Sequence, residues 1–299
     1  MKYIILLTLF SVFGCQAYSQ GDLLSQLDSG QKPVTNYAYA AFKSTRVINA
    51  ESLENDAAGV LDFRISHRFG ALNSGPDGLW GLDAASLRIG LEYGITRWLE
   101  VGLGINAPQN LADGFAKVKI LRQSRGAINM PVTVIYFGGI TSALPPQQAY
   151  TGEYNNYTNR LTYTNQIIIG RKFSEAFSFE VLPTFIHRNV AADTLPNQND
   201  ETAVGVGGRW KFAKSLALNG EYFFVTSGRV PNTYNSASIG LDIETGGHVF
   251  QLFVTNSPGT VEPEFIGQTP NRWRDGGIIF GFNISRVFTI VNKDYTGKY

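Results

Sequence analysis

The fold is decided by two neighbouring stretches, residues 87–95, which read LRIGLEYGI, and residues 99–106, which read LEVGLGIN. In both stretches an aliphatic or aromatic side chain alternates with a charged residue, an asparagine or a glycine. Successive side chains of a β-strand point to opposite faces of the sheet, so each stretch predicts a strand with one apolar face. A soluble antiparallel sheet shows the same alternation, so one stretch alone does not decide the class of protein.

The same alternation recurs along the chain, with no helical segment of useful length in between. Most of the predicted strands have the roughly 9–11 residues of a tilted membrane strand, whereas strands of soluble sheets have about 5–6. We therefore predict an all-β fold, a closed antiparallel up-and-down transmembrane β-barrel of 12 strands, with 14 strands as the alternative. The predicted strands are 59–69, 84–95, 98–107, 114–122, 130–138, 161–172, 176–188, 201–212, 215–226, 237–245, 248–256 and 276–288.

Long and short connections alternate almost throughout the predicted barrel. Residues 139–160, 189–200 and 257–275 form long connections, while 213–214 and 246–247 are tight turns. Outer-membrane barrels have tight periplasmic turns and long extracellular loops. We therefore expect the first strand to run outward and the twelfth to return, which leaves the C-terminus in the periplasm.

Residues 1–19 read as a secretory signal peptide. Lys2 supplies the positive charge, residues 4–14 the short apolar run, and residues 17–19 (Ala-Tyr-Ser) the cleavage pattern. The alternative is a lipoprotein signal that ends at Cys15. Because this is the only cysteine, a chain cleaved after the Ala-Tyr-Ser pattern has no disulfide, thiol nucleophile or cysteine metal ligand.

The mature chain divides into three predicted parts. Residues 20–58 form an N-terminal segment that is either periplasmic or inserted into the lumen, residues 59–290 form the barrel, and residues 291–299 form a periplasmic tail. The stretch 37–48 has strand character, and for this reason the alternative with 14 strands stays open.

The composition limits the partners of this protein. Only 16% of its residues are charged and the net charge is +1, so there is no electrostatic reason to expect nucleic acid as a partner. No apolar stretch reaches the roughly 20 residues of a membrane helix. The expected partners are outer-membrane lipid, the barrel assembly machinery, and either a small solute or a partner protein. The aromatic residues of the last strand are of the kind that the assembly machinery recognises, namely Phe280, Phe282 and Phe288.

The polar faces of the predicted strands point into the lumen if the aliphatic faces point to lipid. They carry eight basic and seven acidic residues, and this mixture favours ion-pair ladders that fill a narrow barrel over a lumen of one sign, with a solute path as the alternative. The predicted lumen-lining residues are Asp62, Arg64, Arg68, Arg88, Glu92, Glu100, Lys117, Lys119, Glu180, Arg188, Arg209, Lys211, Glu221, Asp242 and Glu244.

Candidate chemistry is sparse. His67 and His187 lie near predicted strand ends, on the same face as the lipid-facing apolar residues, where the membrane interface hydrates them. The alternative is that the two side chains pair at the extracellular rim as metal ligands or as a catalytic base. Ser66 is on the opposite face from its neighbouring histidine. The polar residues of the loop 193–201 offer oxygen ligands for Ca²⁺, but a solvated loop explains them better. We expect no catalytic residue, no metal site and no cofactor.

Several short strings give the chain a family resemblance. They are 67–70 (HRFG), 81–83 (GLD), 171–174 (RKFS), 187–189 (HRN), 246–252 (GGHVFQL), 255–257 (TNS) and 281–288 (GFNISRVF). Together they resemble an exported β-barrel family of Gram-negative bacteria known as domain of unknown function 5777, over roughly residues 40–290. The resemblance implies an outer-membrane β-barrel and carries over no functional residue.

The function that we expect is therefore that of a non-enzymatic, porin-like outer-membrane barrel that acts as a channel or transporter for a small solute. A structural or docking barrel for a periplasmic or cell-surface protein is the alternative. An outer-membrane enzyme that acts on lipid is the third hypothesis.

Overall fold

The computed structural model describes residues 34–144, 156–190 and 199–292. The predicted signal peptide lies outside the described residues, and so does most of the predicted C-terminal tail. Twelve antiparallel strands form a closed barrel in which β14 pairs with β2. The predicted fold class is therefore confirmed, and the alternative with 14 strands is wrong. The barrel strands are β2 (Val60–Ala71), β3 (Ala85–Gly94), β4 (Leu99–Asn106), β5 (Leu111–Leu121), β7 (Thr133–Ala143), β8 (Leu161–Lys172), β9 (Phe177–Arg188), β10 (Asp200–Lys211), β11 (Leu216–Ser227), β12 (Ala237–Thr245), β13 (His248–Thr255) and β14 (Ile279–Thr289).

The two remaining strands explain why the count is not 14. β1 (Thr35–Tyr37) and β6 (Ser124–Gly126) pair with each other in a separate two-stranded sheet. Because the connection between β5 and β7 contains β6, it is longer than predicted. The predicted strands 114–122 and 130–138 are accordingly displaced by a few residues at that connection.

Alternation places the two faces of each barrel strand in different surroundings. In β4, 70% of the surface of Leu103 is exposed on the outside, while Glu100 is completely buried on the inside. Leu103 pairs across to Leu91 of β3, and both point outward. The apolar belt that results from such pairs is the surface that a membrane-spanning barrel presents to lipid.

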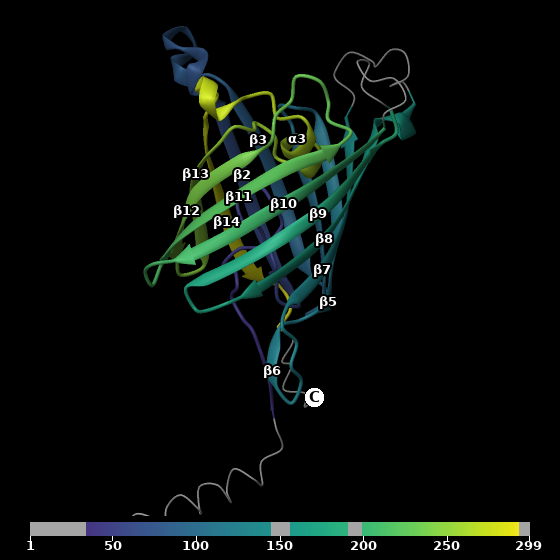
Figure 1. The fold of residues 1–299 in the computed structure, drawn as a ribbon, viewed down its shortest axis with the longest axis vertical. Helices are drawn as coiled ribbons and strands as arrows, with labels where there is room; N and C mark the ends of the chain where they lie inside the picture. The colour runs from purple at the N-terminus through teal and green to yellow at the C-terminus, as the bar shows by residue number, and fades with distance from the viewer. Residues whose placement is uncertain (1–33, 145–155, 191–198, 293–299) are drawn as a thin grey trace, which may run out of the picture.

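The connections differ in length between the two ends of the barrel (Figure 1). The long-loop end carries four short helical segments: η1 (Leu72–Ser74), η2 (Pro76–Gly81), η4 (Tyr157–Arg160) and η5 (Trp273–Asp275). The short-turn end carries the β1–β6 sheet, and both ends of the described chain lie there. Within the described residues, the structure contains no helix with the length and apolar character needed to cross a membrane.

Two segments fill the lumen from opposite ends. Residues 38–57, which we call the plug segment, enter at the short-turn end. They form a bend at Val47–Ala50, closed by a backbone hydrogen bond of 2.8 Å, and return to β2. Residues 256–269, which we call the inserted loop, enter from the long-loop end and contain α3 (Glu262–Gly267). Most of the side chains in the middle of both segments are buried.

Candidate functional site in the lumen

The barrel wall has a polar half and an apolar half on its inner face. The polar half lies on β12 to β14 and on β2 to β4, where charged and amide side chains point inward. The apolar half lies on β5 and on β7 to β11, where the plug segment and α3 contribute Phe42, Val47, Leu53 and Phe265 to one buried cluster. Inward-facing wall residues of that cluster include Phe115, Ile135, Phe137, Ile168, Leu182, Ile186 and Phe223. The expectation that aliphatic residues face only lipid is therefore wrong for these strands, because the plug segment and α3 supply an apolar partner inside.

The tip of the plug segment is bound by Glu221 of β11. The backbone N–H groups of Ile48, Asn49 and Ala50 donate to this carboxylate at 3.0–3.2 Å, and the side-chain amide of Asn49 donates at 2.6 Å. Bonds from several donors to an ionised acceptor are stronger than neutral hydrogen bonds. Glu221 therefore holds the tip of the plug segment in place against the wall.

Other polar side chains of the wall contact the same tip. Gln251 of β13 donates to the backbone oxygen of Val47 at 2.8 Å, and Asn283 of β14 donates to that of Ile48 at 2.9 Å. Arg68 of β2 donates to the Asn49 side chain at 2.7 Å. The wall thus satisfies the backbone groups that the bend leaves unpaired, as buried polar groups require.

Below the tip, Arg46 of the plug segment lies at the centre of a buried ion network. Its guanidinium is 2.6 Å from Glu51, 3.6 Å from Glu92 and 3.1 Å from Glu262 of the inserted loop. Burial lowers the pKa of Arg46, but the neighbouring carboxylates outweigh this effect and raise it above its ordinary value. Arg46 therefore stays charged and connects the two segments that fill the lumen.

Lys117 of β5 holds the two limbs of the plug segment together. Its ammonium group donates to the backbone oxygen of Thr45 at 3.0 Å, to Glu51 at 3.1 Å and to the backbone oxygen of Glu54 at 2.6 Å. All three donors of the ammonium group are satisfied within the lumen. Lys117 thus stabilises the position of the plug segment inside the lumen.

The inserted loop carries two acidic groups that are buried at the far side of the plug segment. Burial raises the pKa of Glu262 to about 7, although Arg46 acts to lower it. Burial also raises the pKa of Glu264 to about 7, against hydrogen bonds from the backbone of Thr260 and Val261. Both carboxyl groups therefore titrate near neutral pH.

The structure places the predicted lumen residues as follows. Most of them are buried on the inner wall, and the three that are half-buried lie near the short-turn end, namely Lys119, Lys211 and Glu244. Glu244 pairs with Arg209 at 3.1 Å and with Lys43 at 3.2 Å. The fully buried ones are Asp62, Arg64, Arg68, Arg88, Glu92, Glu100, Lys117, Glu180, Arg188, Arg209, Glu221 and Asp242.

The proposed rim pair of histidines is not brought together. His67 is on β2 and His187 is on β9, which are six strands apart around the ring of twelve in either direction. His67 stacks on Phe282 at 4.9 Å, and His187 contacts Asp200 at 2.6 Å. A shared metal ion or a joint catalytic role for the two is excluded by this separation.

Part of the loop 193–201 lies outside the described residues. Asn199 donates to the backbone oxygen of Arg188 at 2.6 Å, and Glu201 pairs with Arg188 at 2.9 Å. The side chains of Asn199 and Glu201 thus contact the end of the neighbouring strand β9.

Sequence reasoning missed the residues of the plug segment that make most of these contacts. The sequence predicts residues 20–58 either in the periplasm or in the lumen, with strand character over 37–48, and it does not indicate which contacts the polar stretch 44–54 (STRVINAESLE) makes. Glu262 lies in the long connection 257–275, which the sequence predicts outside the barrel. No periodic signal decides between the two alternatives for residues 20–58 or places the inserted loop in the lumen.

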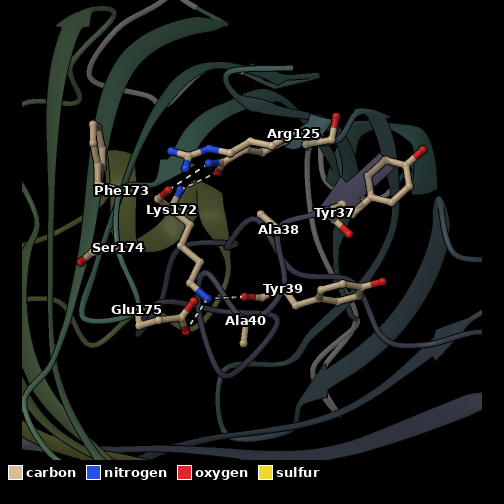
Figure 2. A pocket seen from close by; sticks show the side chains of 12 residues that line it. Tyr37, Ala38, Tyr39, Ala40, Arg125, Lys172, Phe173, Ser174 and Glu175 are labelled. Carbon is tan, nitrogen blue, oxygen red and sulfur yellow. Dashed lines mark hydrogen bonds and ion pairs between the residues drawn. The ribbon is translucent and has the colours of Figure 1, made fainter. Parts of the chain in front are cut away.

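A cavity of about 530 Å³ opens at the short-turn end, beside the entry of the plug segment. Figure 2 shows Lys172 reaching from the wall toward the backbone of Tyr39. The ammonium group of Lys172 donates to the backbone oxygen of Tyr39 and to Glu175, each at 2.8 Å. The entry point of the plug segment is thus tied to the turn between β8 and β9.

The chain matches the model of a family described as "Membrane bound beta barrel domain" (DUF5777) over residues 42–288. No curated protein matches it. Among solved structures, it is similar to a NanC porin, with 10% identity, a TM-score of 0.46 and coverage of 76% of this chain and 98% of that one. It is also similar to the KdgM porin in complex with disordered oligogalacturonate (8% identity, TM-score 0.45, coverage 77% and 99%). A third is an outer membrane channel from Pseudomonas putida F1 (11% identity, TM-score 0.43, coverage 79% and 98%).

Proposed function

Because this chain belongs to the family of membrane-bound β-barrel domains (DUF5777), we propose that it is an outer-membrane channel for small solutes that its own plug segment closes. The match over residues 42–288 also confirms the family that the short sequence strings predicted. Export by a signal peptide and insertion in the outer membrane are part of this proposal, and the long-loop end then faces outward.

The observation that carries the proposal is the chemistry of the contact between plug segment and wall. The tip is bound through Glu221 of β11 and, on the polar half of the barrel, through Gln251 of β13 and Asn283 of β14, and each of these bonds can be replaced by a bond to water. These polar bonds can open in exchange for bonds to water, while the apolar side chains of the plug segment, such as Phe42 and Leu53, keep their contacts with the buried cluster on the other side of the lumen. The polar half of the lumen is then the path that a hydrated solute follows past the displaced segment.

The proposal is tested by liposome swelling in small uncharged sugars. Glu221→Ala removes the acceptor of four donors at the plug tip, and each buried donor left unpaired costs about 1–3 kcal/mol. The released tip then gains water partners, so we expect faster swelling than with the wild-type protein. Glu201→Gln is the matched control, because Glu201 is a buried carboxyl group of the inner wall that pairs with Arg188 of the neighbouring strand and not with the plug segment. Equal swelling by Glu221→Ala, Glu201→Gln and wild type would contradict a plug that closes a channel.

A second candidate function, a docking barrel, is favoured by the part of the molecule outside the membrane belt. The β1–β6 sheet extends beyond the short-turn end (Figure 1), and apolar side chains are exposed beside its strands, with 69% exposure of Val34 just before β1 and 56% of Ile128 just after β6. Such a surface suits a periplasmic protein partner. A site-specific photo-crosslinker at Ile128, with exposed Asn129 as the control position, would give a defined adduct in intact cells only if a partner docks there.

A further inference from the structure

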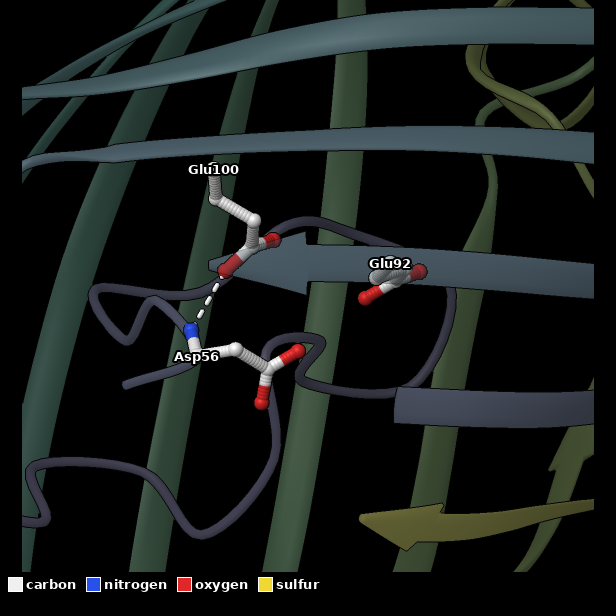
Figure 3. A group of neighbouring side chains, drawn as sticks. All are labelled: Asp56, Glu92 and Glu100. Atoms are coloured by element: carbon white, nitrogen blue, oxygen red, sulfur yellow. Dashed lines mark hydrogen bonds between the residues drawn. The ribbon is translucent and has the colours of Figure 1, made fainter. Parts of the chain in front are cut away.

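Three carboxyl groups converge where the returning limb of the plug segment meets the barrel wall. Asp56 belongs to the plug segment, Glu92 to β3 and Glu100 to β4. One carboxylate oxygen of each lies within 4.8 Å of the others. Figure 3 shows the carboxyl groups of Asp56 and Glu92 turned toward each other, with Glu100 beside them. Three separate parts of the chain thus direct acidic oxygens into one small volume.

Several of these oxygens have no hydrogen-bond partner. Glu100 is completely buried, and its Oε2 accepts the backbone N–H of Asp56 at 2.5 Å, but its Oε1 accepts no hydrogen bond. Oδ2 of Asp56 is also buried without a partner. Burying a carboxylate oxygen without a partner is unfavourable by several kcal/mol at most sites. Asp56 and Glu100 thus each bring a buried carboxylate oxygen without a partner to this cluster, and a cation there would supply one.

The carboxyl group of Glu92 has more polar neighbours than those of Asp56 and Glu100. Its Oε2 accepts the hydroxyl of Thr45 at 2.6 Å, and its Oε1 lies 3.6 Å from the Nε atoms of both Arg46 and Arg64. Neither arginine contact is a hydrogen bond at that distance. Glu92 is therefore the weakest ligand of the three, and Asp56 and Glu100 are the decisive ones.

The charges around this cluster do not balance. Six carboxyl groups and three cationic side chains are linked by ion pairs, hydrogen bonds and the cross-strand pair of Glu100 with Lys117. Buried charges are stable only when they are paired or bind a metal. The acidic groups are Glu51, Asp56, Asp62, Glu92, Glu100 and Glu262, and the cationic groups are Arg46, Arg64 and Lys117. A divalent cation would compensate most of the excess negative charge.

We propose that Asp56, Glu92 and Glu100 bind one divalent cation, and that this ion is Ca²⁺ rather than Mg²⁺. Mg²⁺ requires near-ideal octahedral geometry and gives up its water ligands reluctantly, whereas Ca²⁺ accepts irregular sets of carboxylate oxygens. Three carboxyl groups that come from three separate parts of the chain, with one oxygen of each within 4.8 Å of the others, therefore suit Ca²⁺ better. Asp56 also lines a cavity of about 410 Å³ at the short-turn end, which gives the ion a route of entry. The bound ion fixes the returning limb of the plug segment to β3 and β4.

The experiment is equilibrium dialysis of radioactive Ca²⁺ against the full-length barrel in detergent after treatment with a chelator. We expect one ion per chain, with Mg²⁺ competing weakly, and a higher unfolding temperature with Ca²⁺. Asp56→Asn and Glu100→Gln should each weaken binding by about tenfold or more, which is the loss typical of damaged metal sites. Glu180→Gln is the control, because Glu180 is a completely buried wall carboxyl group outside the cluster.

If Glu100→Gln, which changes a barrel strand, folds poorly, Asp56→Asn still tests the proposal, because Asp56 lies on the plug segment outside the barrel strands. Heat-modifiable migration on gels verifies that each variant forms the barrel. No binding at millimolar Ca²⁺ overturns the proposal. Equal binding by wild type and both variants also overturns it, because the ion then binds elsewhere. None of these results bears on whether the plug segment closes a channel, since liposome swelling tests that independently.

Discussion

Leu103 and the two glycines beside it show how a single residue position is assigned to lipid or lumen. Leu103 faces outward from β4 with 70% exposure, while Gly102 and Gly104 face the lumen. A Cβ atom at Gly102 would overlap the ring of Phe115, and one at Gly104 would overlap the guanidinium of Arg88. These glycines therefore make room for inward-pointing side chains, and even Gly102→Ser would disturb the packed lumen.

Leu103→Arg tests the assignment to lipid. An arginine on the lipid face near the bilayer midplane destabilises a barrel by about 2–4 kcal/mol, so we expect the free energy of unfolding to fall by about that amount. Leu103→Phe, which keeps the position apolar, should change it by less than about 1.5 kcal/mol. Urea unfolding in lipid vesicles measures both variants. If Leu103→Arg were as stable as Leu103→Phe, the outer face of β4 would not contact lipid.

At the scale of elements, the barrel strands could be predicted closely, whereas the sequence leaves residues 20–58 open between periplasm and lumen and predicts residues 257–275 in an external loop. Strands such as β8 and β12 match their predicted bounds because alternation is a local property of the sequence. The path of residues 38–57 depends on contacts with Glu221, Lys117 and Asn283, which lie far away in the sequence. The lumen-lining residues of the strands could be predicted, because every second residue of a strand points to the same face. Their partners in the plug segment and in α3 could not be predicted, because these partners lie outside any strand with alternating residues.

The docking of the inserted loop should depend on pH. The pKa values of Glu262 and Glu264 are raised to about 7 in the folded protein, from ordinary values near 4.5. Between these values the docked loop holds protons that an undocked loop releases, so docking is strengthened as pH falls through 7 and weakened as pH rises through it. Hydrogen exchange of residues 256–269, corrected for intrinsic rates, should therefore be slower at pH 6 than at pH 8.

The double variant Glu262→Gln and Glu264→Gln isolates the two groups responsible. Neither amide titrates, so the difference in corrected exchange between pH 6 and pH 8 should disappear in this variant. Protection that is equal at both pH values in the wild type, or greater at pH 8, would contradict a loop held by these two carboxyl groups.

At the scale of the whole molecule, the barrel is a membrane-spanning wall around a core that its own chain provides. The plug segment contacts the wall through β2, β5, β11, β13 and β14, among other strands, so it lies across the lumen. The inserted loop meets it from the other end at the ion pair of Arg46 with Glu262. Two segments therefore fill the lumen, and they contact each other through this ion pair.

The central claim, that the plug segment closes the lumen, is tested most directly by conductance in planar lipid bilayers. The full-length protein is compared with a chain from which residues 34–57 are deleted, after gel migration has shown that the deleted chain still forms a barrel. We predict that the full-length protein is closed for most of the recording and that the deleted chain gives long-lived open channels. Equal conductance of the two proteins would contradict the claim.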